Sequence, residues 1–188
     1  MQFEVEQKHR IDDVAEFVAR LTERGATLGA AAEQSDRYFA HPCRDFVKTD
    51  EALRIRTVAG KSLVTYKGPK LDTTTKTRRE LELPLDPNDA DGSRFSELLV
   101  ALGFTPVAIV RKKRRPFQLS HGGRVVDGAL DEVDGVGTFV ELELRADDAS
   151  LDEAKRLIAA LGVELHLGPS ERRSYLEMLL ETRPRRDN

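Results

Sequence analysis

Residues 1–10 read MQFEVEQKHR, and charged side chains alternate there with uncharged ones: Glu4, Glu6 and Lys8 are separated by Val5 and Gln7. Side chains of a β-strand point alternately to its two faces, so both carboxylates and the ammonium share one face. In a single strand this alternation is typical of an edge with one solvated face. A solvated edge strand is no longer the favoured interpretation, however, because the same alternation recurs along the chain.

Five later segments repeat this two-faced pattern. They are LRIR (53–56), VTYK (64–67), RRELEL (78–83) and FVELEL (139–144), in which a mainly apolar face opposes a polar one, and VRKKR (110–114), which can put Val110, Lys112 and Arg114 on one face. The charged face carries Arg54, Arg56, Lys67, Arg78, Glu80, Glu82, Lys112, Arg114, Glu141 and Glu143. A shift of one residue in the RKKRR run would turn Arg111, Lys113 and Arg115 to this face instead.

If these strands form one sheet, a whole face of that sheet is charged. An open antiparallel sheet can show such a face to water, and this alternative stays open. Two features favour a closed barrel: helices with apolar stripes must cover the apolar face, and the charged face contains few of the Thr, Ser and Gln of an ordinary solvated surface. A barrel of eight strands is wide enough to hold one small ligand.

The mixed signs of charge indicate what such an interior would bind. Arg and Lys donate hydrogen bonds to phosphate oxygens, and Arg binds two oxygens at once. Carboxylates are hard ligands for Mg²⁺ or Mn²⁺, which bind through carboxylates together with substrate phosphates. The sequence therefore predicts a site for a metal–polyphosphate complex.

The bulk composition limits the class of protein. The chain has 188 residues, 34% of them charged, and a net charge of -3, which argues against a dedicated nucleic-acid partner. Cys43 is the only cysteine, so an internal disulfide and a cysteine zinc site are excluded. We expect no membrane partner, because no apolar run is long enough to span a bilayer, and no signal peptide, because no basic stretch followed by an apolar core opens the sequence. A cytoplasmic protein is therefore expected.

The remaining segments complete an expected α+β protein of about eight strands and four helices, mainly antiparallel. Helical spacing and end signals predict helices over 11–25, 93–103, 150–162 and 169–182. The Ala59–Lys61 stretch predicts a hairpin. The polar stretch 68–77 is expected to be a mobile loop.

Taken together, these motifs resemble the CYTH superfamily of triphosphate tunnel metalloenzymes. Glu4-Val-Glu6-Gln-Lys8 resembles the family's ExExK signature, which alone is weak. The resemblance continues in order through DRYFAHPCRDFVKTDEALRIR, LVTYKGPK, RRELEL, VRKKRRPF, LDEVDGVGTFVELEL and RSYLEMLL. The HPCRDF…TDEALRIR, TYKGPK and SYLEMLL stretches are most similar to the class IV adenylyl cyclase branch.

The resemblance implies a single domain over 1–183, followed by a polar tail at 184–188. Its fold would be an eight-stranded antiparallel closed barrel with flanking helices and a charged interior. By the same similarity the metal ligands would be Glu4, Glu6, Asp131, Glu141 and Glu143. The phosphate-binding residues would be Lys8, Arg54, Arg56, Lys67, Arg78, Lys112 and Arg114, with Lys8, Arg54 and Arg114 also catalytic.

Some residues remain open at this point. Glu80 and Glu82 would bind metal through water or balance the neighbouring arginines. Asp36 and Tyr38 match the family without an assigned role, and Tyr38 has the alternative of a rim residue that orders its neighbours. Cys43 and the four histidines receive no role in the site.

The activity implied by the resemblance is conversion of ATP to 3′,5′-cyclic AMP and pyrophosphate, with Mg or Mn divalent cations. One alternative is a triphosphatase acting on inorganic triphosphate, thiamine triphosphate or a nucleoside triphosphate, in which water replaces the ribose 3′-hydroxyl. Another is a polyphosphate- or nucleotide-binding module without turnover. The expected partner is ATP or another triphosphate, and the expected assembly is a monomer or homodimer.

Overall fold

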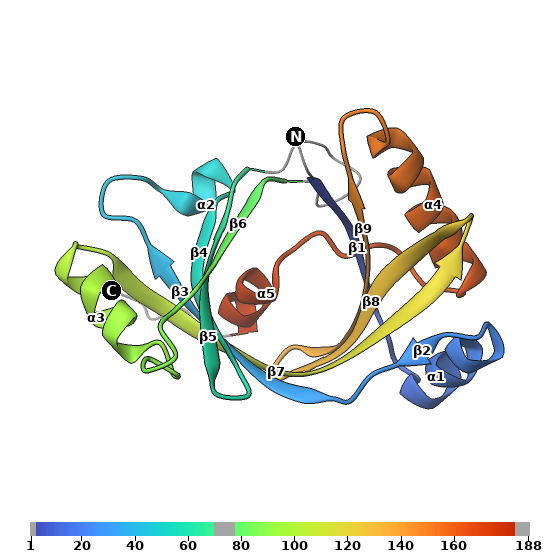
Figure 1. Ribbon diagram of the computed structural model, residues 1–188, viewed down its shortest axis with the longest axis horizontal. Helices are drawn as coiled ribbons and strands as arrows, with labels where there is room; N and C mark the ends of the chain where they lie inside the picture. The colour runs from blue at the N-terminus through green and yellow to red at the C-terminus, as the bar shows by residue number, and fades with distance from the viewer. Residues whose placement is uncertain (1–2, 70–77, 183–188) are drawn as a thin grey trace.

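The computed structural model describes residues 3–69 and 78–182, and these form one curled antiparallel sheet with helices around it (Figure 1). The strands of the described part are β1 (Phe3–Arg10), β2 (Thr27–Leu28), β3 (Ala32–Ala40), β4 (Ala52–Val58), β5 (Lys61–Lys67), β6 (Glu80–Pro84), β7 (Thr105–His121), β8 (Arg124–Val133) and β9 (Gly137–Ala146). Most of the loop expected at 68–77, and the tail expected at 184–188, lie outside the described residues.

The order of the strands brings distant parts of the sequence together. Eight strands follow one another as β1-β9-β8-β7-β3-β4-β5-β6, and the short β2 pairs with β7. The two ends of this series meet where Glu4 of β1 forms an antiparallel bridge with Arg78, just before β6. The predicted eight-stranded antiparallel α+β fold is therefore confirmed, as a sheet curled into a half-barrel whose β1 forms a single bridge to the residue that lies two positions before β6.

Two tight turns fix the register of neighbouring strands. Ala59 and Gly60 join β4 to β5, and both have positive φ (48° and 71°). Gly122 and Gly123 join β7 to β8 with φ of 56° and 76°. Two-residue hairpins of the I′ type require positive φ at both positions, which glycine adopts without steric cost. The hairpin predicted at Ala59–Lys61 is confirmed.

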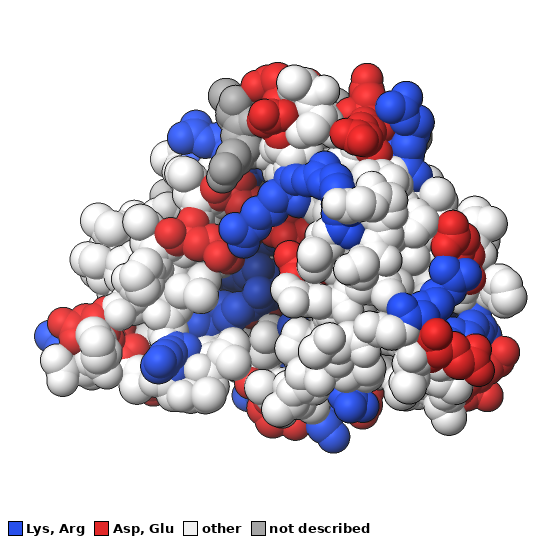
Figure 2. Space-filling model, turned by 45° about the vertical axis from the view of Figure 1, so that its right-hand side comes forward, with Lys and Arg blue, Asp and Glu red and all other residues white. Residues whose placement is uncertain are grey.

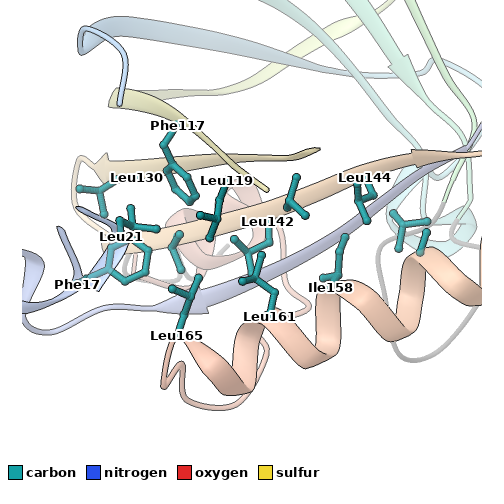
Figure 3. Close-up of a cluster of buried hydrophobic side chains, with 14 of the residues drawn as sticks. Phe17, Leu21, Phe117, Leu119, Leu130, Leu142, Leu144, Ile158, Leu161 and Leu165 are labelled. Carbon is teal, nitrogen blue, oxygen red and sulfur yellow. The ribbon is translucent and has the colours of Figure 1, made fainter. Parts of the chain in front are cut away.

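In the described part of the chain, five helices accompany the sheet. They are α1 (Val14–Glu23), α2 (Phe46–Thr49), α3 (Ser93–Ala101), α4 (Leu151–Glu164) and α5 (Tyr175–Thr182). Two of them, α2 and α5, help to line the interior of the sheet. Between α1, α4 and the sheet lies the largest apolar cluster, shown in Figure 3. Leu142 of β9 and Leu161 of α4 are both fully buried there. Burying one such leucine contributes about 1.5–3 kcal/mol.

The outer face of β6 departs from the prediction. Leu81 and Leu83 alternate with Glu80 and Glu82 as expected, but they are 46% and 64% exposed. The helix that follows, α3, packs instead over Phe39 and its neighbours on other strands. In the part of the chain that the structure describes, no element covers the leucines of β6.

The helical content also differs from the prediction at two places. A short helix, α2, begins after Asp45, whose carboxylate accepts hydrogen bonds from the Val47 and Lys48 amides. The last helix begins at Tyr175, six residues later than predicted. A capping box sets this start: the Glu177 amide donates to Ser174 Oγ, and the Ser174 amide donates to the Glu177 carboxylate.

The segment between α4 and α5 is extended and runs along β1. The Glu171 amide donates to the Lys8 carbonyl at 2.6 Å, and His9 forms a bridge with Ser170. This pairing places α5 beside the middle of the barrel (Figure 1). Within the described residues, no helix is both long and apolar enough to span a bilayer.

Candidate active site

The interior of the barrel is a cavity of about 570 Å³ lined by both signs of charge. Basic and acidic side chains gather in the hollow at the centre of Figure 2. The charged residues that line its strand-built part are Glu4, Glu6, Lys8, Arg54, Arg56, Lys67, Arg78, Glu80, Glu82, Lys112, Arg114, Glu141, Glu143 and Arg145. All the site residues expected from the sequence except Asp131 thus line this cavity.

The structure decides the register of the RKKRR strand. Lys112 and Arg114 of β7 line the cavity. Lys113 and Arg115 line a separate hollow of about 300 Å³ on the outside, beside α1. The register adopted is therefore the one in which Lys112 and Arg114 face the interior, and Lys113 and Arg115 face outward.

Carboxylates crowd one part of the cavity, where β1 lies next to β9. Glu6 is directly opposite Glu143, and Glu4 shares a side-chain hydrogen bond with Glu143. Burial, followed by this hydrogen bond, raises the pKa of Glu4 to about 7. Burial also raises the pKa of Glu80 and Glu143. Such a cluster favours a bound cation, because added positive charge relieves the repulsion.

Lys67 lies beside this cluster. It pairs with Glu80, and its Nζ lies 3.9 Å from the Glu4 carboxylate. Across the chain the described residues contain no group of three carboxylate, thiol or imidazole side chains placed to hold a metal ion.

Asp131 lies beneath the cavity surface and is fully buried. Its carboxylate accepts hydrogen bonds from Lys112 Nζ at 2.9 Å, Arg114 Nε at 2.7 Å and the Tyr175 hydroxyl at 3.0 Å. Arg114 also pairs with Glu141. In this geometry Asp131 holds two of the predicted phosphate-binding cations, and its expected role as a metal ligand stays a prediction.

A second buried carboxylate, Asp36, orients the arginines of β4. It accepts from Arg56 Nε at 2.7 Å and Nη2 at 2.8 Å, and from Arg54 Nη1 at 3.3 Å. Burial alone would raise the pKa of Asp36, but the charge of Arg54 and the bonds from Arg56 hold it well below its usual range. Arg54 Nε is buried and finds no hydrogen-bond partner within the described residues.

The segment before α5 closes over Lys8. The Lys8 ammonium donates to the Arg173 carbonyl at 2.5 Å and lies 4.0 Å from the centre of the Tyr175 ring. Lys112 Nζ lies 4.9 Å from the same ring. Tyr175 therefore contacts two predicted phosphate-binding lysines as well as Asp131, and burial raises its pKa well above the ordinary value.

Sequence reasoning missed two of these cavity residues. Arg145 continues the alternation of Glu141 and Glu143 in β9, so extending that pattern by one step would have found it. Tyr175 lies 44 residues from Asp131 in sequence. No local pattern signals that contact, because it depends on where the C-terminal segment crosses the barrel.

A curled antiparallel sheet enclosing acidic and basic side chains defines the class of protein, and comparison with known proteins identifies the family. The CYTH domain family profile matches residues 2–175, and the chain belongs to this family.

Two curated relatives match over most of the chain. The "Putative adenylate cyclase MJ0240" of Methanocaldococcus jannaschii is 36% identical over 180 residues, covering 93% of this chain and 97% of the relative. The "Adenylate cyclase CyaB" of Aeromonas hydrophila is 28% identical over 185 residues, covering 93% and 87%. Among solved structures, the PH1819 protein of Pyrococcus horikoshii is 40% identical, with a TM-score of 0.84 over 96% of this chain and 99% of the other.

Proposed function

We propose that this chain converts ATP into 3′,5′-cyclic AMP and pyrophosphate inside the barrel, in the manner of a class IV adenylyl cyclase. The observation that carries the proposal is a single cavity in which carboxylates and strongly basic groups face the same space. The names of the relatives from Methanocaldococcus and Aeromonas support the choice of reaction. The substrate's ribose 3′-hydroxyl would attack its α-phosphorus, and pyrophosphate would leave.

The carboxylate cluster fits divalent metal ions that arrive with the substrate. Mg²⁺ is typically held by one or two protein carboxylates together with substrate phosphates, so a ready-made cage is not required. Glu4, Glu6, Glu141 and Glu143 would hold such ions, Mg²⁺ or Mn²⁺. When bound, the ions would make the 3′-hydroxyl more acidic and neutralise charge on the leaving pyrophosphate.

The basic residues would grip the phosphate chain and stabilise charge as it develops. Arg54 has a buried Nε whose hydrogen bond no described residue takes, so a phosphate oxygen could accept it. Arg114 and Arg56 keep their guanidinium planes fixed through Asp131 and Asp36. Groups held in advance lose little energy to reorganisation during the reaction, which is why such donors are effective in catalysis.

Lys8, Arg54 and Arg114 are the residues that we place closest to the reacting phosphorus. Lys112 would assist with a pKa lowered to about 8, chiefly by burial and then by the charge of Arg114. Lys67 and Arg78 would bind the phosphates nearer the carboxylate cluster. No covalent intermediate is needed, because the attacking hydroxyl belongs to the substrate itself.

The runner-up function is a triphosphatase. A Hippeastrum protein described as an adenylyl cyclase candidate with a dominant triphosphatase activity has the same fold, with a TM-score of 0.67 at 18% identity. That likeness concerns the fold alone, but the charges in this cavity would serve a water nucleophile equally well. A binding module without turnover is the third candidate.

Product analysis separates the three candidates. The protein is incubated with ATP and Mn²⁺, and the products are resolved by chromatography, with a parallel sample containing excess chelator. We expect cyclic AMP and pyrophosphate, and no product in the chelated sample. ADP and orthophosphate would favour the triphosphatase, and no product from any triphosphate would favour the binding module. The cytoplasmic location and the monomeric or dimeric state stay predictions.

A further inference from the structure

Tyr175, the first residue of α5, is held in the wall of the cavity from two sides. Its side chain is buried, and its ring packs against the Phe139 ring with 5.3 Å between the two ring centres. The segment that precedes it is tied to β1, because the Glu171 amide donates to the Lys8 carbonyl. The position of the Tyr175 ring is therefore set by the packing of the protein itself.

The Tyr175 hydroxyl completes the set of donors around the Asp131 carboxylate. It donates to Asp131 Oδ2 at 3.0 Å, and the same oxygen accepts from Lys112 Nζ at 2.9 Å and from Arg114 Nη2 at 2.5 Å. Arg114 Nε donates to the other carboxylate oxygen at 2.7 Å. A phenol adds its hydrogen bond without adding a third positive charge. The hydroxyl thus restrains the buried carboxylate that holds two basic residues of the cavity.

The aromatic ring of Tyr175 contacts two further basic groups directly. Lys8 Nζ lies 4.0 Å from the ring centre, and Lys112 Nζ lies 4.9 Å from it. An aromatic face attracts an ammonium group within about 6 Å, and the attraction is stronger where the groups are removed from water, as both of these lysines are. One side chain therefore contacts Lys8 and Lys112 and reaches Arg114 through Asp131.

We propose that Tyr175 is a positioning residue of the reaction, which fixes Lys8, Lys112 and Arg114 in one arrangement around the phosphate chain. The inference rests on the proposed function, because that function assigns these three cations to the substrate. Loss of the hydroxyl alone leaves all three charges in the cavity, so the attraction for the substrate persists. A misplacement of about 1 Å can nevertheless cost about a hundredfold in rate, so the chemical step should slow more than binding weakens.

Three substitutions separate the hydroxyl from the ring. Tyr175→Phe removes only the hydroxyl, and Tyr175→Leu removes the ring as well. The matched control is Tyr66→Phe, because the Tyr66 hydroxyl also donates to a carboxylate, that of Glu51. Turnover of ATP with Mn²⁺ gives kcat and KM, and calorimetry gives the Kd of inorganic tripolyphosphate with Mg²⁺. Melting temperatures establish that each variant is folded, and Tyr175→Phe decides alone if Tyr175→Leu does not fold.

The expected result is a split between rate and binding. Tyr175→Phe should lower kcat by about tenfold, with KM and the tripolyphosphate Kd changed by less than about threefold. Tyr175→Leu should in addition weaken tripolyphosphate by about fivefold, because the ring contacts are lost. Tyr66→Phe should behave as the wild type. An unchanged kcat in Tyr175→Phe, or a Kd that rises as much as kcat falls, would overturn the inference.

A double-mutant cycle tests whether the hydroxyl acts through Asp131. In an Asp131→Ala background, Tyr175→Phe should lower kcat by less than about twofold further, because the carboxylate on which the hydroxyl acts is gone. Additive losses would overturn this route, and the comparison with Tyr66→Phe decides if the Asp131 variant does not fold. Absence of turnover of any triphosphate by the wild type would overturn the proposed function, whereas tripolyphosphate binding by the Leu and Phe variants would still test the effect of the ring.

Discussion

Two buried aspartates organise the basic residues of the cavity. Asp36 holds Arg54 and Arg56, and Asp131 holds Lys112 and Arg114, each through direct hydrogen bonds. Without these anchors the long basic side chains would have many rotamers, and ordering them on a substrate would cost conformational entropy. The aspartates therefore position the residues that we expect to contact phosphate.

Removing the Asp36 anchor tests its contribution to stability. Asp36→Asn leaves two largely buried guanidiniums without their counter-charge, and we expect a loss of about 3 kcal/mol in the free energy of unfolding at pH 7. Urea denaturation measures this loss. The pKa of Asp36 is lowered in the folded protein, so its stabilising effect is complete above the unfolded pKa of about 3.9.

The difference in the free energy of unfolding between the wild type and Asp36→Asn should also depend on pH, in a direction that the lowered pKa of Asp36 determines. As the pH falls below about 3.9, Asp36 binds a proton in the unfolded chain but stays ionised in the folded protein, so the unfolded state gains stability and the advantage of Asp over Asn shrinks. The gap in stability between the two proteins should therefore narrow in this window and stay constant between pH 5 and 7. A variant as stable as wild type at pH 7 would contradict the account.

The carboxylate cluster is tested by an isosteric change. Glu6→Gln keeps the size of the side chain and removes the charge, so we expect turnover to fall by about a hundredfold or more at low metal concentration, with the melting temperature preserved. Glu132→Gln is the control, because Glu132 is exposed on the outer face of β8. Wild-type turnover in the Glu6 variant would show that this carboxylate is not a metal ligand.

At the residue scale, sequence periodicity predicted which side chains share the interior. It worked because strand side chains alternate strictly, so Glu141 and Glu143 had to face the same way. It did not predict that the Asp131 carboxylate would accept hydrogen bonds from Lys112, Arg114 and Tyr175. Hydrogen-bond partners depend on distances between strands and on the path of α5, which no local pattern contains.

At the scale of elements, β6 is the strand whose alternation of leucines and glutamates predicts a buried apolar face that the structure leaves exposed. Its leucines alternate correctly with glutamates, but α3, the described helix that follows it in sequence, packs elsewhere. Alternation determines which face a residue occupies and says nothing about whether another element covers that face. The late start of α5 has a similar explanation, because the Ser174–Glu177 capping box competes with continuation towards residue 169.

A pair of substitutions compares the covered and the uncovered leucines. Leu83→Lys should change the free energy of unfolding by no more than about 0.5 kcal/mol, since surface substitutions usually stay within that range. Leu142→Ala in the core of Figure 3 should cost about 2–5 kcal/mol. Denaturant titration measures both. A loss above about 2 kcal/mol for Leu83→Lys would show that another surface, such as a second copy of the chain, covers β6.

At the scale of the whole molecule, the strand order creates the site. Strand β1 pairs with β9, β3 lies between β7 and β4, and the bridge from Glu4 to Arg78 joins the two ends. Periodicity alone predicted strands and their faces but could not give this order. The resemblance to a known family supplied the closed barrel, since pairing between distant strands is set by packing of the complete chain.

The central claim is that the nucleophile is the substrate's own 3′-hydroxyl, and 3′-deoxy-ATP tests it most directly. The account predicts that 3′-deoxy-ATP binds nearly as tightly as ATP, because the proposed contacts of Arg54, Arg56, Lys67 and Arg114 are with the triphosphate and not with the ribose. It should release no pyrophosphate and should inhibit the formation of cyclic AMP competitively. Consumption of 3′-deoxy-ATP at the rate of ATP, with release of orthophosphate, would show that water is the nucleophile and would contradict the cyclase account.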